Sequence, residues 1–111
     1  MTRSTLLLVS VLAFAPVLLT GQQEKPHSYA PERGFVPDSA TAIRIAEAIW
    51  IPIYGQAQIE NERPFTATLK DDVWTVTGSL KAAPGHVAKG GVALVEIGKK
   101  DGRILRVSHG K

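Results

Sequence analysis

The sequence FTATLKDDVWTVTGSL, at residues 65–80, is the strongest indication of the fold class. Apolar and polar side chains alternate before and after Asp71 and Asp72, and a period of two residues is typical of a strand with one buried face. Two such runs joined by a short polar turn predict an antiparallel hairpin. We therefore expect the core to be built on a sheet.

A second hairpin is predicted toward the C-terminus. Its strands are expected at 91–98 and 103–109, and the turn between them contains Asp101 and Gly102. Aspartate followed by glycine favours such a turn because glycine readily adopts positive φ angles. Residues 81–91, which join the two hairpins, form a loop too long for a simple turn. The four strands together predict an antiparallel meander.

A helix is predicted before the first strand, at residues 38–50. Asp38 can cap it by accepting hydrogen bonds from the first turn, and Pro52 kinks or ends it because proline has no N–H to donate. Gly55 suits the residue that terminates the helix, and 56–64 is expected to be a polar connection. Apolar residues recur every three or four positions, as in one buried stripe. The stripe consists of Ala42, Ile45, Ala46, Ile49 and Ile53.

These elements predict an α+β fold, in which an N-terminal helix kinked at Pro52 packs on a curved four-strand antiparallel meander. A single helix covers only one face of such a sheet. The side chains expected to face the helix are Phe65, Ala67, Leu69, Trp74, Val76, Ala93, Val95, Ile97, Leu105 and Val107. The side chains expected on the other face are Thr66, Thr68, Lys70, Thr75, Thr77, Glu96, Arg106 and Ser108.

The N-terminus has the pattern of a secretory signal. Arg3 precedes an apolar run at 6–19, which as a helix would be about 21 Å long and too short to span a bilayer. We expect 1–21 to be a signal peptide, 22–35 a flexible leader and 36–111 the folded domain. The protein would then be periplasmic or secreted. The alternative is a retained N-terminal anchor, which would be the chain's one attachment to a membrane.

Composition excludes several kinds of site. The chain has 111 residues, no cysteine and a formal net charge of +3. Without cysteine it forms no disulfide, thiolate metal site or cysteine nucleophile. The charge is too small to indicate nucleic-acid binding by itself, and the basic residues near the C-terminus lack the interleaved aromatic residues that stack on bases. We therefore expect no nucleic-acid partner.

No catalytic, cofactor-binding or metal-binding residues are predicted. The three histidines lack the spacing that places two ligands on one helix face. Glu60 and Glu62, like Asp71 and Asp72, lie in polar connections where both carboxylates of each pair should stay solvated, whereas a catalytic acid needs a perturbed pKa. The glycine-containing loop at 85–91 lacks the lysine and the following helix of a phosphate loop.

The stretch from 34 to 111 also resembles a known family. The matching residues are Val36-Pro37-Asp38, Ala42 to Trp50, Pro52 to Gly55, Pro64-Phe65, Leu69, Trp74, Val76, Gly78, Gly90-Gly91, Glu96-Ile97, Lys100 to Leu105 and Ser108 to Lys111. With them the chain is similar to bacterial polymorphic-toxin immunity proteins with a nuclear-transport-factor-2-like fold, the YbbC/YhhH group. The resemblance implies a cone-like sheet wrapped on helices, also described as cystatin-like, with no catalysis and a protein toxin as the partner.

The first hypothesis is therefore an exported immunity protein that binds and neutralises a toxin. The residues expected at the interface are Tyr54, Lys70, Glu96, Arg103 and Arg106, because charges speed encounter and a few anchors supply affinity. One alternative is a small-ligand-binding domain or enzyme that uses the pocket of the cone, which would need a buried acid or histidine. Another is a generic envelope module that inhibits a protease.

Overall fold

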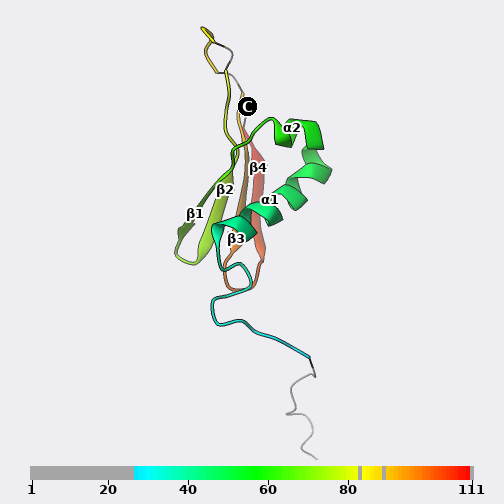
Figure 1. The fold of residues 1–111 in the computed structure, drawn as a ribbon, viewed down its shortest axis with the longest axis vertical. Coiled ribbons are helices and arrows are strands. Elements are labelled where there is room, and N and C mark those ends of the chain that lie inside the picture. Colours follow the sequence, from blue (N-terminus) through cyan, green and yellow to red (C-terminus); the bar gives the residue numbers. More distant parts are fainter. Residues whose placement is uncertain (1–26, 83, 89, 111) are drawn as a thin grey trace, which may run out of the picture.

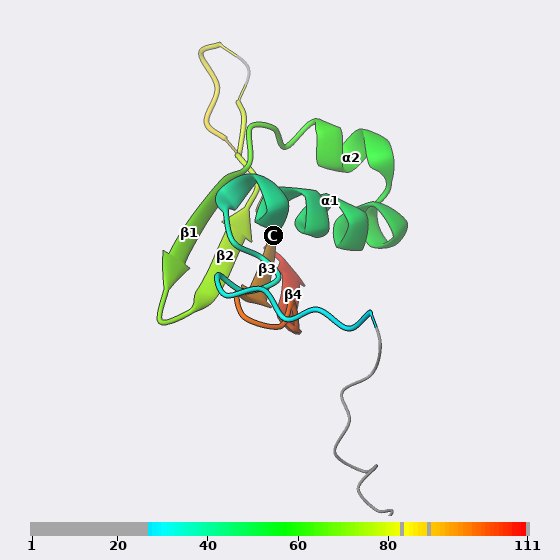
Figure 2. The same ribbon diagram turned by 60° about the horizontal axis from the view of Figure 1, so that its bottom comes forward.

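The structure confirms the predicted α+β fold. A computed structural model describes residues 27–82, 84–88 and 90–110, so the predicted signal peptide at 1–21 lies outside the described residues. The elements are α1 (Ser39–Tyr54), α2 (Gln56–Glu60), β1 (Thr66–Lys70), β2 (Val73–Thr77), β3 (Ala93–Gly98) and β4 (Ile104–His109). The strands form one antiparallel sheet in the order β1-β2-β3-β4, and both helices lie on the same side of it (Figures 1 and 2).

Helix α1 begins at the cap that the sequence indicated but runs four residues beyond the predicted end at residue 50, to Tyr54. The Asp38 carboxylate accepts from the backbone N–H of Thr41 at 2.8 Å and from its hydroxyl at 2.6 Å, and these bonds lower the pKa of Asp38. The helix continues past Pro52 for two residues, so Pro52 does not end it. It ends at Gly55, whose φ of 97° lies in the range that favours glycine.

Helix α2 is an addition to the predicted elements. Residues 56–64 were expected to be a polar connection, but their first five residues form a short helix. Ile59 is fully buried and anchors this helix to the core. Five residues are too few to display a helical period, which is why the sequence pattern did not indicate it.

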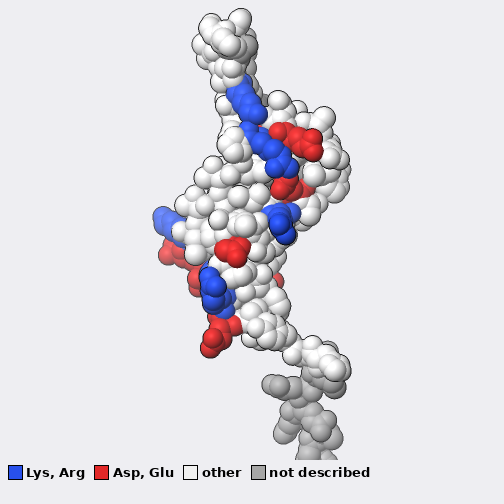
Figure 3. All heavy atoms as spheres, in the orientation of Figure 1, with Lys and Arg blue, Asp and Glu red and all other residues white. Residues whose placement is uncertain are grey.

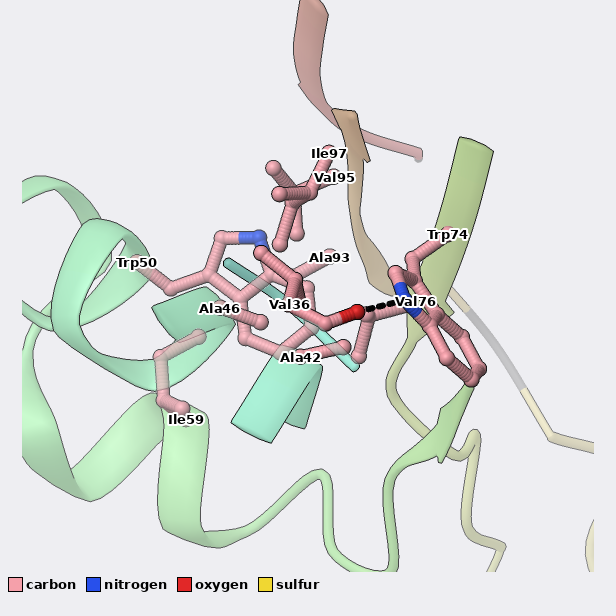
Figure 4. Close-up of a cluster of buried hydrophobic side chains, with 10 residues drawn as sticks. All are labelled: Val36, Ala42, Ala46, Trp50, Ile59, Trp74, Val76, Ala93, Val95 and Ile97. Carbon is pink, nitrogen blue, oxygen red and sulfur yellow. Dashed lines mark hydrogen bonds between the residues drawn. The ribbon is translucent and has the colours of Figure 1, made fainter. Parts of the chain in front are cut away.

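The core lies between α1 and the sheet. Figure 4 shows Trp50 of α1 and Trp74 of β2 with smaller side chains between them. The indole N–H of Trp74 donates to the carbonyl of Val36 at 2.8 Å, so the segment before α1 is fixed to the sheet. The buried apolar side chains are Val36, Ala42, Ala46, Trp50, Ile59, Trp74, Val76, Ala93, Val95 and Ile97.

Two side chains predicted to face the helix are instead exposed. Leu69 is 43% exposed and Leu105 is 46% exposed. Helix α1 packs against β1, β2 and β3 and leaves β4 largely uncovered. In addition, an irregularity in the pairing of β3 with β4 places Ile104, not Leu105, opposite Ile97. A bulge of this kind shifts the alternation that the sequence pattern assumed.

The segment before α1 is paired with the turn between β3 and β4. Phe35 and Val36 donate backbone hydrogen bonds, each 3.0 Å long, to the carbonyls of Lys100 and Lys99. Gly34 precedes them with a φ of 85°, and a Cβ at this position would lie 2.5 Å from the carbonyl oxygen of Lys99. Glycine is therefore required here for both its backbone angle and its lack of a side chain.

We expect Gly34→Ala to lower the free energy of unfolding by about 2 kcal/mol or more, because a left-handed alanine costs about 1–2 kcal/mol before the clash is counted. Gly102→Ala is the matched control. Its φ is 76°, but the nearest atom to an added Cβ is a methyl of Val36 at 3.8 Å, an ordinary contact. Chemical denaturation of both variants measures the difference. Equal losses of unfolding free energy in the two variants would show that the segment before α1 moves away from the added Cβ at no cost in stability.

Candidate functional site

The face of the sheet opposite the helices is open and polar. Both helices lie on the other face (Figure 2). The strand register aligns Thr68, Thr75, Glu96 and Arg106 in one row across all four strands. Threonine and charged side chains in such a row present hydroxyl, carboxylate and guanidinium groups to a partner. This surface, which we call the open face, matches the expectation from the sequence.

Four of the five predicted interface residues lie on this side of the molecule. Lys70 pairs with Val73 at one edge of the open face, and Arg103 lies beside Gly98 at the opposite edge. Glu96 and Arg106 are cross-strand partners whose carboxylate and guanidinium groups are 3.7 Å apart. Since this ion pair is solvent-accessible it contributes little stability, and both groups remain able to contact a partner.

Tyr54, the fifth predicted interface residue, lies elsewhere. It occupies the end of α1, and its ring centroid is 5.0 Å from that of His109. The five predicted interface residues are therefore divided between two sides of the molecule. Tyr54 lies on the helix side, beside a cluster of polar side chains that the sequence did not reveal.

This cluster is centred on Glu62, the one buried charged residue among those described, with 3% of its surface exposed. Its carboxylate accepts from the backbone N–H of Ala93 at 2.7 Å and from the amide of Gln58 at 2.9 Å. The ring nitrogen Nε2 of His109 lies 2.8 Å from the same carboxylate. Gly78 leaves room for it, since a Cβ there would collide with Glu62. Glu62 thus ties the segment after α2 to β3 and β4.

The hydrogen bonds set the charge of this pair. Burial by itself would raise the pKa of Glu62, but the bonds from Ala93, Gln58 and His109 outweigh it, so the pKa lies below its ordinary value of 4.5. The hydrogen bond to Glu62 raises the pKa of His109 above 6.5, and the bond to the carbonyl of Gly110 acts in the same direction. Both shifts favour a carboxylate paired with an imidazolium.

A pH dependence of stability follows from these two shifts. The contribution of His109 is fully present below its unfolded pKa of 6.5 and is lost as the pH rises through the higher folded value. The contribution of Glu62 is present above 4.5 and is lost as the pH falls through the lower folded value. We therefore expect the thermal midpoint to decline as the pH rises above 6.5 and through the raised pKa of folded His109.

The matched variants for this prediction are His109→Gln and His86→Gln. His86 lies exposed in the loop between β2 and β3. The first variant should flatten the alkaline decline and the second should preserve it. A decline that persists unchanged in His109→Gln would show that the Glu62–His109 pair is not its source.

The Glu62–His109 pair is arranged as a clamp between distant segments of the chain. The second ring nitrogen of His109 is 2.8 Å from the carbonyl of Gly110, so both nitrogens are engaged. A general base needs a nitrogen within reach of a substrate proton. The nearby hydroxyl of Ser79 donates to the carbonyl of Pro64 at 2.5 Å. These groups border an open hollow of about 240 Å³, whose rim includes Lys81.

The position of Glu62 corrects the sequence interpretation, which placed its carboxylate in a solvated connection. Glu96 does face outward as predicted, in register with Arg106, but Glu62 is the interior carboxylate. The signal available in the sequence was Ile59. An apolar residue three positions before Glu62 indicates that this segment has a buried side.

The remaining candidates do not assemble into a site. Within the described ranges, no three His, Asp or Glu residues lie close enough to hold a metal ion. No helix in the described part of the chain is long and apolar enough to cross a membrane. On the face shown in Figure 3, basic and acidic side chains are interspersed and neither sign dominates. This distribution lacks the continuous basic stripe typical of nucleic-acid binding.

Comparison with known proteins gives consistent matches. A family profile described as NTF2 fold immunity protein matches residues 41–111. The chain is 40% identical over 79 residues to the uncharacterized protein YhhH of Escherichia coli (strain K12) and 38% identical over 76 residues to the uncharacterized protein YbbC of the same strain. These alignments cover 71% and 68% of this chain and 60% of each relative, so the chain spans about 60% of their length. No solved structure matches it.

Proposed function

This chain belongs to the family of NTF2-fold immunity proteins, and we propose that it binds a partner protein toxin and neutralises it by direct contact. The observation that carries the proposal is the open face, a four-strand polar surface that the helices leave uncovered in a member of this family. Shape and charge on such a surface suit contact with another macromolecule. The engaged nitrogens of His109 support a role without catalysis.

The proposal includes export. The basic start and short apolar run at 1–21 support a secretory signal, and an exported inhibitor meets its toxin in the cell envelope. A toxin directed at the wall or the membrane therefore fits better than a cytosolic nuclease. Fractionation of cells that express the whole chain tests this part, and a purely cytoplasmic product of unprocessed mass would contradict it.

The first candidate partner to test is the product of any toxin-like reading frame adjacent to this gene. We expect the protein to bind it and to restore growth when the two are expressed together. Thr75→Lys should weaken both effects, because it adds a charged side chain to the centre of the open face. The substitution is compatible with folding because its cross-strand neighbour is Glu96.

The matched control is Ala48→Lys, which places the same side chain on the exposed side of α1. It should leave binding and protection unchanged. Wild-type protein that neither binds the toxin nor protects would refute the proposed function. Equal effects of the two lysines would show that the open face is not the contact.

A ligand-binding function has one observation in its favour, the buried carboxylate of Glu62 beside the hollow. Leu80 lines this hollow, and Leu80→Trp would fill it. A ligand-dependent protein should lose activity with this change and keep it in Thr75→Lys, whereas a toxin-binding protein should show the reverse. The full occupation of both His109 nitrogens makes the toxin-binding function the better supported one.

A further inference from the structure

β4 is one of the two edge strands of the sheet and the one that α1 leaves largely uncovered. Helix α1 packs on the other three strands. Its first residues, Ile104 and Leu105, are consequently 37% and 46% exposed. An exposed edge strand that carries apolar side chains is a template for pairing with another chain, and natural proteins usually shield it.

The backbone of β4 has groups free for such pairing. The backbone N–H of Gly110 donates to the carbonyl of Val92 at 3.1 Å, so Val92 and Gly110 form a hydrogen-bonded pair of the antiparallel ladder. Hydrogen-bonded and non-hydrogen-bonded pairs alternate along an antiparallel ladder. Val107 and His109 therefore belong to non-hydrogen-bonded pairs and direct their backbone N–H and C=O away from β3. Among the described residues, no backbone group bonds to them there.

The charges at this edge indicate the chemistry of its partner. Arg103 and Arg106 lie at and just before β4, and the strand itself contains no acidic residue. The side chain of Arg106 is 59% exposed although it faces Glu96. The opposite edge differs, because Lys70 of β1 is followed directly by Asp71 and Asp72. The β4 edge therefore has a net positive charge and the β1 edge does not.

We propose that the free edge of β4 binds an extended strand of the partner toxin that carries acidic side chains, so that this strand becomes the fifth in the sheet. The inference rests on the proposed function and names the part of the surface that recognises the toxin. Backbone hydrogen bonds supply affinity in this mode of binding, and side chains on alternate positions supply specificity. A second copy of this chain fits poorly, since it would bring Arg103 and Arg106 of both copies together.

The test compares changes at the β4 edge with changes elsewhere, and its probe is the toxin domain whose binding the proposed function predicts. Val107→Pro removes a backbone N–H from the free edge of β4, and Leu69→Pro removes one from the free edge of β1. Proline is tolerated where the N–H of an edge strand faces solvent. Arg103→Glu and Arg44→Glu form the second pair, because Arg44 is an exposed arginine of α1, a helix that hardly reaches β4.

We expect Val107→Pro and Arg103→Glu each to raise the Kd for the toxin domain at least tenfold, and Leu69→Pro and Arg44→Glu to change it less than twofold. Arg103→Glu keeps the result interpretable if Val107→Pro unfolds, which a thermal melt reveals. Equal or reversed effects at the two edges would overturn the assignment to β4 and leave the proposed function standing. Failure of the wild type to bind would refute both. A dimer of the free protein that Val107→Pro abolishes would assign the edge to a second copy instead.

Discussion

Replacing Trp50 with alanine is expected to lower the free energy of unfolding by about 4 kcal/mol. Trp50 is fully buried, and its side chain is the largest among the fully buried residues that the structure describes. Its ring packs against Phe65 with centroids 5.4 Å apart and fills the space between α1 and the sheet. A small domain has a total stability of about 5–15 kcal/mol, so much of the population should unfold under mild denaturant. Urea titration followed by circular dichroism measures the loss.

Trp50→Phe is the informative control. The indole N–H of Trp50 is buried and finds no acceptor among the described residues. A buried unpaired donor costs about 1–3 kcal/mol, and phenylalanine removes it while it keeps most of the apolar volume. We therefore expect Trp50→Phe to cost about 1 kcal/mol or less, because the released penalty offsets part of the lost packing. A loss as large as that of alanine would indicate that the N–H has a partner after all.

The elements that sequence patterns predicted are those determined by near neighbours along the chain. The cap of Asp38 is complete within three residues, and Gly55 ends α1 through its own backbone angle. The turn of the first hairpin likewise needs only Asp71 and Asp72, whose φ angles of 51° and 62° are positive. Aspartate tolerates this conformation better than most residues. Local chemistry of this kind is visible in a sequence.

The features that the patterns missed depend on contacts between distant segments. Leu105 alternates correctly with its neighbours, and only the bulge in the pairing with β3 takes it out of register. Leu69 is exposed although α1 packs against β1, so its exposure depends on where the helix lies on the sheet. Neither fact is encoded in the strand's own residues.

The candidate site shows the same division. The outward phase of Lys70, Glu96 and Arg106 follows from strand alternation, and the structure places these side chains as predicted. Glu62 and His109, in contrast, are 47 residues apart, and the fold alone brings them together. A polar residue in a predicted connection has no local signal that it will be buried. Because Glu62 is buried and hydrogen-bonded, its replacement is expected to have a large effect on stability.

Glu62→Ala is expected to lower the free energy of unfolding by about 3 kcal/mol. The change leaves the buried N–H of Ala93 without an acceptor, and an unpaired buried donor costs about 1–3 kcal/mol. It also removes the bonds from Gln58 and His109, and bonds to a charged group contribute about 1.5–3 kcal/mol each before relaxation. For a domain of this size the thermal midpoint should fall by about 12 °C or more, as measured by differential scanning calorimetry.

Glu60→Ala provides the contrast, because Glu60 lies two residues away and is exposed, with a single surface bond from Gln56. Its effect should stay within about 0.5 kcal/mol. His109→Gln should fall between the two, since it removes one of three partners of Glu62 and leaves the bond to Ala93 intact. If the Glu62–His109 pair acts as a clamp, the loss of stability should be largest for Glu62→Ala, intermediate for His109→Gln and smallest for Glu60→Ala. If Glu62→Ala were as mild as Glu60→Ala, the carboxylate would not be what joins the segment after α2 to the C-terminal strand.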